Sequence, residues 1–143
     1  MSGTATRINL MDLDLIRMEE FFVSIGEKPF RAEQVLKWIY HARVTDFGKM
    51  TNLGMELRQR LPGLAVIEPP KILREQTSTD GTVKWLMGSG AGNAIETVFI
   101  PETKRGTLCI SSQVGCALNC SFCSTGAQGF SRNLSASEII GQV

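Results

Sequence analysis

The stretch QVGCALNCSFCSTGAQGF, residues 113–130, holds three of the four cysteines of the chain. These are Cys116, Cys120 and Cys123, and the fourth, Cys109, lies just upstream. Three thiolates on one short loop can hold a metal centre. A structural zinc site usually takes four protein ligands, so zinc would need Cys109 as well. An iron–sulfur cube fits three thiolates better, because one iron then stays open for a substrate or cofactor.

Histidine adds no clear metal ligand to the cysteine loop. The single histidine, His41, lies far upstream in a helical stretch, where we interpret it as a surface or packed side chain.

The first residues lack the apolar core of a secretory signal, and no apolar run approaches the ~18–20 residues of a membrane span. We therefore expect a cytoplasmic protein with reduced thiols that serve as metal ligands or reactive groups.

Composition and net charge do not by themselves indicate a nucleic-acid-binding protein. The 143 residues are 43% hydrophobic and 20% charged, as in an ordinary globular protein. The net charge is only +1, so bulk electrostatics give no argument for nucleic-acid binding. Any contact with RNA must come from local patches.

The first half of the chain has helical periodicity. Three segments are predicted as helices, namely 12–26 with Leu15 in its apolar stripe, 29–42, and 50–61 with Thr51 or Asn52 as its cap. EPPKI, residues 68–72, then marks a boundary. The connections between these segments are short, so the sequence predicts a compact helical module before that boundary.

After the boundary the pattern alternates as in strands. Residues 71–77 and 82–88 flank Asp80–Gly81, a hairpin-turn signal, and GSGAGN at 88–93 is predicted as a turn. Alternation along 94–101 places Glu96 on the face opposite Ile95 and Thr97. TLCISSQ, 107–113, is predicted as one strand leading into the cysteines, and 133–143 as a helix capped by Ser135 or Ser137 with Glu138 in its first turn.

The cysteine loop resembles that of a known enzyme superfamily. The C-x3-C-x2-C spacing, with Phe122 just before the last cysteine, is similar to the loop of the radical S-adenosylmethionine enzymes. The resemblance implies a [4Fe–4S] cluster held by Cys116, Cys120 and Cys123, with Phe122 near S-adenosylmethionine. It also implies a (β/α) barrel in which this loop follows the first strand.

The flanking segments resemble one family within that superfamily. They are TSTDGTVKWLM, IETVFIPE, RGTLCISSQVGCALNCSFCSTGAQGFSRNL, SEIIGQV, INLMDLDLIRMEEFF and GEKPFRAEQVLKWIYH. Together they are similar to the radical S-adenosylmethionine adenine C2-methyltransferases of 23S ribosomal RNA and some tRNAs. A related family that methylates C8 of the same ribosomal adenine matches the flanks less well.

The resemblance implies an α/β fold in three parts. These are a small helical RNA-binding domain at 1–70, a β-hairpin and strand extension at 71–105, and the first strand and the start of the first helix of an incomplete barrel at 106–143. We expect Lys28, Arg31 and Lys37 to help to grip RNA. The implied partners are 23S rRNA, tRNA and an electron donor such as a flavodoxin system, with no membrane, and the chain is expected to be a monomer.

The family chemistry gives roles to two further residues. A cysteine of the enzyme is first methylated, a radical made from a second S-adenosylmethionine activates that methyl group, and the carbon radical adds to adenine C2. Glu96 matches the proton acceptor of the family, and Cys109 matches the cysteine that releases the protein–RNA adduct and leaves a disulfide. Without the resemblance, Cys109 would be interpreted as a packed strand thiol and Glu96 as an exposed surface charge.

No position of this chain matches the methyl-carrying cysteine, which lies near the C-terminus of the full enzyme. The later barrel strands that hold S-adenosylmethionine also have no counterpart. We therefore expect an N-terminal part that does not turn over by itself. The alternative is a non-catalytic iron–sulfur or zinc-binding module that binds nucleic acid.

Overall fold

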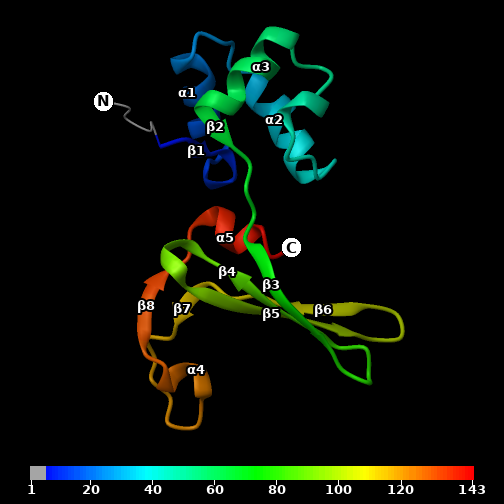
Figure 1. Cartoon of the computed structure of the whole chain (residues 1–143), viewed down its shortest axis with the longest axis vertical. Coiled ribbons are helices and arrows are strands. Elements are labelled where there is room, and N and C mark those ends of the chain that lie inside the picture. Colours follow the sequence, from blue (N-terminus) through cyan, green and yellow to red (C-terminus); the bar gives the residue numbers. More distant parts are fainter. Residues whose placement is uncertain (1–5) are drawn as a thin grey trace. The chain divides into compact units, whose positions relative to one another are not determined.

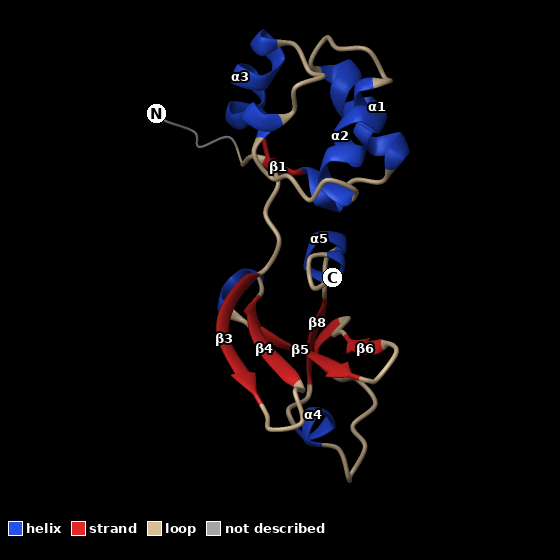
Figure 2. Ribbon diagram, turned by 90° about the vertical axis from the view of Figure 1, so that its right-hand side faces the viewer, coloured by secondary structure: helices blue, strands red, loops and turns tan. Residues whose placement is uncertain are grey.

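The computed structural model describes residues 6–143, which form two compact units. The helical unit extends to Glu68 and the sheet unit comprises Pro69–Val143 (Figures 1 and 2). Each unit has its own hydrophobic core, so each is described by itself. None of the helices in residues 6–143 is long and apolar enough to cross a membrane.

The helical unit contains three α-helices and a short parallel pair of strands. Its elements are β1 (Ile8–Asn9), η1 (Leu10–Asp12), α1 (Leu15–Ser24), α2 (Arg31–Tyr40), η2 (Phe47–Lys49), α3 (Met55–Leu64) and β2 (Ala65–Val66). Strands β1 and β2 pair in parallel. The Asp14 side chain caps α1 by accepting from the Arg17 N–H.

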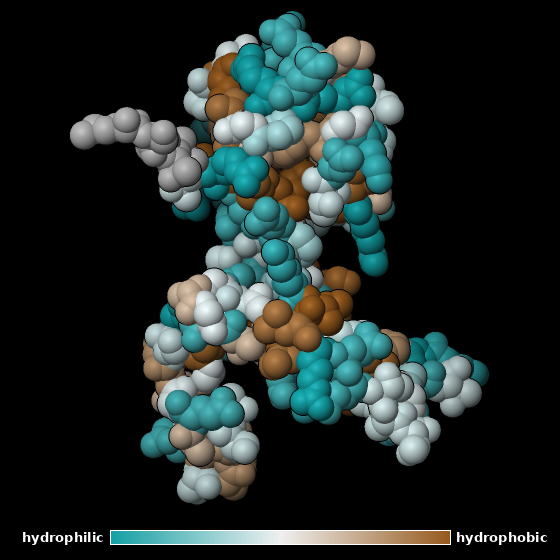
Figure 3. Space-filling model, in the orientation of Figure 1, coloured by the Kyte–Doolittle hydropathy of each residue, from teal (hydrophilic) through white to brown (hydrophobic). Residues whose placement is uncertain are grey.

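Apolar side chains from all three α-helices fill the core of this unit. Phe22, Met18, Val35 and Leu61 are fully buried, and the rings of Phe21 and Phe22 meet edge to face at 5.3 Å. Hydrophilic side chains cover much of its visible surface in Figure 3. The predicted apolar stripe of α1 is therefore confirmed except at Leu15, which is 42% exposed because it occupies the first turn of the helix.

The third helix differs from its predicted bounds. It begins at Met55 with Gly54 as N-cap, because the Asn52 side chain accepts a hydrogen bond from Trp38 Nε1 at 2.6 Å instead of capping the helix. It also includes Pro62, where the sequence predicted its end. Proline lacks the N–H that would bond to the preceding turn, and α3 ends two residues later.

The sheet unit is built on four antiparallel strands in the order β3-β4-β5-β6. These are β3 (Lys71–Thr77), β4 (Val83–Gly88), β5 (Ala94–Pro101) and β6 (Gly106–Cys109), with the turn η3 (Gly90–Gly92) between β4 and β5. A second, two-stranded sheet pairs β7 (Gln113–Gly115) with β8 (Phe130–Asn133), and the helices are α4 (Ser124–Ala127) and α5 (Ala136–Ile140). The predicted hairpin at Asp80–Gly81 and the predicted glycine-rich turn are both present.

The strand predicted at 107–113 is broken into β6 and β7, which belong to different sheets. Gln142 explains the break, because its side-chain oxygen accepts the Ser111 N–H at 2.8 Å and its amide donates to the Ser111 carbonyl at 2.7 Å. Strand β7 then pairs antiparallel with β8, and the cysteine loop with α4 connects the two strands. The described residues thus form a mixed α/β structure, with no closed barrel among residues 6–143.

A salt bridge ties three segments of the sheet unit together. Glu138, in the first turn of α5, forms the predicted capping box with Ser135. Its carboxylate also accepts from Arg132 Nη2 at 2.7 Å and from the Gly90 N–H at 2.8 Å. These hydrogen bonds, led by that of Arg132, lower the pKa of Glu138 from 4.5 to about 2.

The acid stability of the sheet unit is expected to depend on Glu138. Because the folded-state pKa is depressed, the stabilisation is complete above pH 4.5 and is lost as the pH falls toward 2. We expect Glu138→Gln to lower the free energy of unfolding at pH 7 by about 1–3 kcal/mol and to flatten its dependence on pH below 4.5. Urea unfolding at a series of pH values measures both effects. Glu102→Gln, in an exposed pair with Arg105, is the matched control, and an equal loss in the control would contradict the prediction.

Candidate active site

The register of the large sheet places two predicted site residues on the same face. Val98 lies opposite Cys109, and Glu96 lies opposite Leu86. Residues two apart on a strand share a face, so Glu96 and Cys109 are diagonal neighbours on adjacent strands, about 7–8 Å apart. The other face is buried, with Ile95 and Thr97 at 4% and 0% exposure. The predicted alternation along this strand is confirmed.

The exposed side of the large sheet, called the open face below, has two rows of side chains. One row crosses Arg74, Leu86 and Glu96, and the next crosses Gln76, Lys84, Val98 and Cys109. A hollow of about 140 Å³ lies between Arg74, Gln76, Lys84, Leu86 and Glu96. Cys109 is a free, exposed thiol in the described part of the chain.

A cation neighbours the candidate proton acceptor. Lys84 Nζ lies 3.1 Å from Glu96 Oε1, and both side chains are about half exposed. Ser111 Oγ donates to the Glu96 carbonyl at 2.7 Å, which fixes the backbone of β5 at this point. Sequence analysis missed Lys84 and Arg74, because their place beside Glu96 depends on the register of three strands.

The cysteine loop begins at β7 and ends at β8, with α4 between them. Its glycines allow close contacts between backbone segments. A Cβ at Gly126 would lie 2.9 Å from Cys120 N, and a Cβ at Gly115 would lie 1.7 Å from Gly129 O. These two glycines therefore permit α4 to pack on the backbone at Cys120 and β7 to pair closely with the return strand.

The three loop thiols are free and partly exposed. Residues 6–143 contain no group of three or more His, Cys, Asp or Glu side chains that could hold a metal ion as placed. The Cys123 thiol precedes α4, and the backbone N–H groups of Gly126 and then Thr125 hold its pKa below its ordinary value. Phe122 is 91% exposed and packs against no core.

The helical unit engages two of its three predicted RNA-contacting residues in its own structure. Arg31 pairs with Glu27 at 3.7 Å and donates to the Gln34 side chain at 2.8 Å. Lys37 lies 3.9 Å from Glu33. For Lys28, no side-chain hydrogen bond or ion pair is present among the described residues. Both ion pairs join residues four apart, and Glu33 and Lys37 lie within the helix predicted at 29–42, so their spacing could have indicated this second pair from the sequence.

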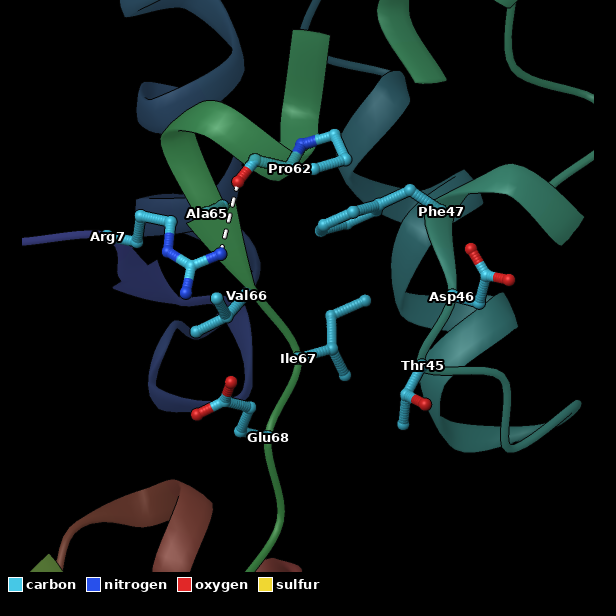
Figure 4. Close-up of a pocket in the computed structure, with 9 residues that line it drawn as sticks. All are labelled: Arg7, Thr45, Asp46, Phe47, Pro62, Ala65, Val66, Ile67 and Glu68. Atoms are coloured by element: carbon cyan, nitrogen blue, oxygen red, sulfur yellow. Dashed lines mark hydrogen bonds between the residues drawn. The ribbon is translucent and has the colours of Figure 1, made fainter. Parts of the chain in front are cut away.

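A second hollow, of about 240 Å³, lies in the helical unit. Figure 4 shows Arg7 at its edge, donating to the Pro62 carbonyl at 3.3 Å, and Phe47 and Ile67 on its apolar side. Its charged side chains are Arg7, Asp46 and Glu68, which give a net charge of −1. None of the predicted site residues lines this hollow, and its charge does not favour a nucleic-acid phosphate.

Comparison with known proteins supports the resemblance that the sequence indicated. Residues 8–67 match the family model of the ribosomal RNA large subunit methyltransferase N-terminal domain. Proteins named dual-specificity RNA methyltransferase RlmN, from Pseudomonas putida (strain GB-1) and Pseudomonas entomophila (strain L48), are each 56% identical over 143 residues. The alignment covers 100% of this chain and 38% of each relative.

A solved structure gives a similar result. The crystal structure of a radical SAM methyltransferase from Sphaerobacter thermophilus matches 94% of this chain with 40% identity and a TM-score of 0.84, and the match covers 40% of that protein. The predicted resemblance to radical S-adenosylmethionine methyltransferases is confirmed.

Proposed function

We propose that this chain, a relative of the RlmN-type RNA methyltransferases along all of its 143 residues, is part of a radical S-adenosylmethionine enzyme that methylates C2 of adenine in 23S ribosomal RNA and in tRNA. The observation that carries the proposal is 56% identity over an alignment that covers the whole chain. The chain spans 38% of the length of these relatives, so the activity is proposed for the full-length protein.

The donor set of the cysteine loop fits an iron–sulfur cluster. Cys116, Cys120 and Cys123 are free thiols on one loop, and iron–sulfur clusters are bound by thiolates. The backbone N–H groups that lower the pKa of the Cys123 thiol favour the thiolate form that such a cluster requires. When bound, the cluster and S-adenosylmethionine would supply a radical that abstracts hydrogen from an unreactive carbon.

The open face supports the roles proposed for Glu96 and Cys109. A carboxylate at this face can take the proton from adenine C2, and the Lys84 ammonium, 3.1 Å away, can orient it. Cys109, diagonal to it, is exposed and can attack the sulfur of a second cysteine. We further propose that Phe122 lies near S-adenosylmethionine, that a flavodoxin system donates the electron, and that the enzyme is a cytoplasmic monomer.

Nucleoside analysis of RNA tests the proposed function. The full-length gene is deleted and then restored, and 23S rRNA and tRNA are digested and examined for 2-methyladenosine by mass spectrometry. We expect the C2-methylated nucleoside to disappear on deletion and to return with the gene. Methylation at C8 instead, or no change in either RNA, would refute the proposal. A colourless protein that holds zinc through all four thiols would favour the non-catalytic module.

A further inference from the structure

The hollow on the open face has the charge of an anion-binding site. Arg74, Lys84 and Glu96 line it, with the amide of Gln76 and the apolar side chain of Leu86. Two cations and one carboxylate give it a net charge of +1. A phosphodiester carries one negative charge, so a single backbone phosphate would neutralise the hollow.

Arg74 is the group in this hollow that is left for a ligand. Within residues 6–143, its guanidinium makes no hydrogen bond or ion pair with another side chain. All of β3 is exposed, so Arg74 keeps its side-chain freedom and its hydration in the protein without ligand. A guanidinium presents paired N–H donors that match two phosphate oxygens.

Lys84 lies next to both Arg74 and the Glu96 carboxylate. It pairs across the sheet with Gln76 on one side and Val98 on the other, so it is diagonal to both Arg74 and Glu96. A phosphate beside Glu96 alone would be repelled. With the Lys84 ammonium 3.1 Å from Glu96 Oε1, one cation can serve both anions.

We propose that Arg74 and Lys84 hold an RNA backbone phosphate beside the reacting adenine, and so place the base at Glu96. This inference rests on the proposed function, because the RNA substrate comes from it. The site binds the nucleic-acid backbone and carries no sequence information, so it positions the RNA without selecting its bases. Gln76 adds a side-chain amide donor on the same row as Lys84.

The salt dependence of RNA binding tests the site. Affinity of the full-length protein for a hairpin RNA with a single-stranded target adenine is measured between 50 and 200 mM salt, without turnover. For a single-stranded RNA, loss of one phosphate contact makes the slope of log affinity against log salt concentration less steep by about 0.7. We expect this change in the Arg74→Gln/Lys84→Gln double variant, with affinity at 50 mM salt weaker by about tenfold.

Matched variants distinguish a specific phosphate site from the nonspecific effect of removing a positive charge. Lys104→Gln removes one cation from the turn between β5 and β6 and is expected to keep both slope and affinity. Arg74→Lys and Lys84→Arg keep the charge and are expected to keep the slope. An unchanged slope in the double variant, or an equal change in Lys104→Gln, would overturn the proposal.

Modified RNA identifies the occupant. A methylphosphonate that replaces one phosphate next to the target adenine is neutral. It should therefore make the salt dependence of RNA binding less steep for the wild-type protein, and it should leave the salt dependence of the double variant unchanged. If no flanking methylphosphonate affects the wild type, the occupant is not a phosphate and the proposal is wrong. Weaker S-adenosylmethionine binding in the variants with an unchanged RNA slope would assign the hollow to the cofactor carboxylate and also refute the proposal.

A methylation assay on the same hairpin RNA, run beside the binding measurements, separates this inference from the proposed function. Wild-type protein that binds the hairpin but never methylates its adenine would refute the methyltransferase function, while the slopes would still decide whether a phosphate site exists. Wild-type protein that methylates adenine, with equal slopes for wild type and double variant, would refute the phosphate site alone.

Discussion

Cys109→Ala in the full-length enzyme is expected to stop turnover at a covalent protein–RNA adduct. Release requires the Cys109 thiolate to attack the sulfur that links the second cysteine to the methylene carbon on the base. The sulfur–carbon bond breaks and its electron pair goes to that carbon, which takes up a proton to become the methyl group, while the two cysteines form a disulfide. Alanine cannot attack, but it removes no proposed ligand of the cluster. A slowly migrating band on a denaturing gel that RNase removes would measure the adduct, and we expect most of the enzyme to accumulate in it.

The geometry of the open face supports this expectation. Cys109 is the last residue of β6, and it lies on the face that also holds Glu96. Its thiol is exposed and free, so the substitution leaves no cavity in a core. The stability of the variant should therefore be close to that of the wild type, and loss of release would reflect chemistry rather than misfolding.

Glu96→Gln is the comparison for this variant. A glutamine cannot accept the C2 proton, so it is expected to slow the step before release, although the releasing thiol is intact. Two other outcomes would contradict the role of Cys109. Normal turnover of Cys109→Ala would make it a passive strand residue, and loss of iron from that variant would make it a cluster ligand.

Local patterns in the sequence predicted those features of the sheet unit that depend on a few neighbouring residues. The capping box of α5 depends on Ser135 and Glu138, which are three residues apart, and the β3–β4 hairpin depends on the turn at Asp80–Gly81. Alternation predicted which face holds Glu96, because side chains along a strand point to opposite faces. These signals are contained within a few residues.

Features that depend on contacts between residues far apart in the sequence were not predicted. The break between β6 and β7 depends on Gln142, which bonds to Ser111 from 31 positions further along the chain and also accepts from the buried Thr97 hydroxyl. The open-face hollow depends on the register of β3, β4 and β5, to which Arg74, Lys84 and Glu96 contribute one residue each. No short window of sequence contains either arrangement.

Alanine at any one of Cys116, Cys120 or Cys123 is expected to abolish the iron–sulfur cluster. A cube held by three thiolates loses a third of its protein ligands with each substitution, and the exposed loop offers no replacement. Anaerobic reconstitution of the full-length wild type should give a brown protein with about four iron and four sulfide per chain. Each variant should stay near background in iron, in sulfide and in the cleavage of S-adenosylmethionine.

Cys109→Ala is the matched control, because it removes a fourth thiol from the same unit and should keep the full iron content. Among residues 6–143 the loop thiols form no metal-binding group as placed, so we expect binding of the cluster to draw them together between the paired strands β7 and β8. Hydrogen exchange at residues 116–127 should therefore slow on reconstitution of the wild type and not in the three variants. Iron retained by any of the three variants would contradict the ligand set, as would tight binding of a single zinc ion by all four thiols.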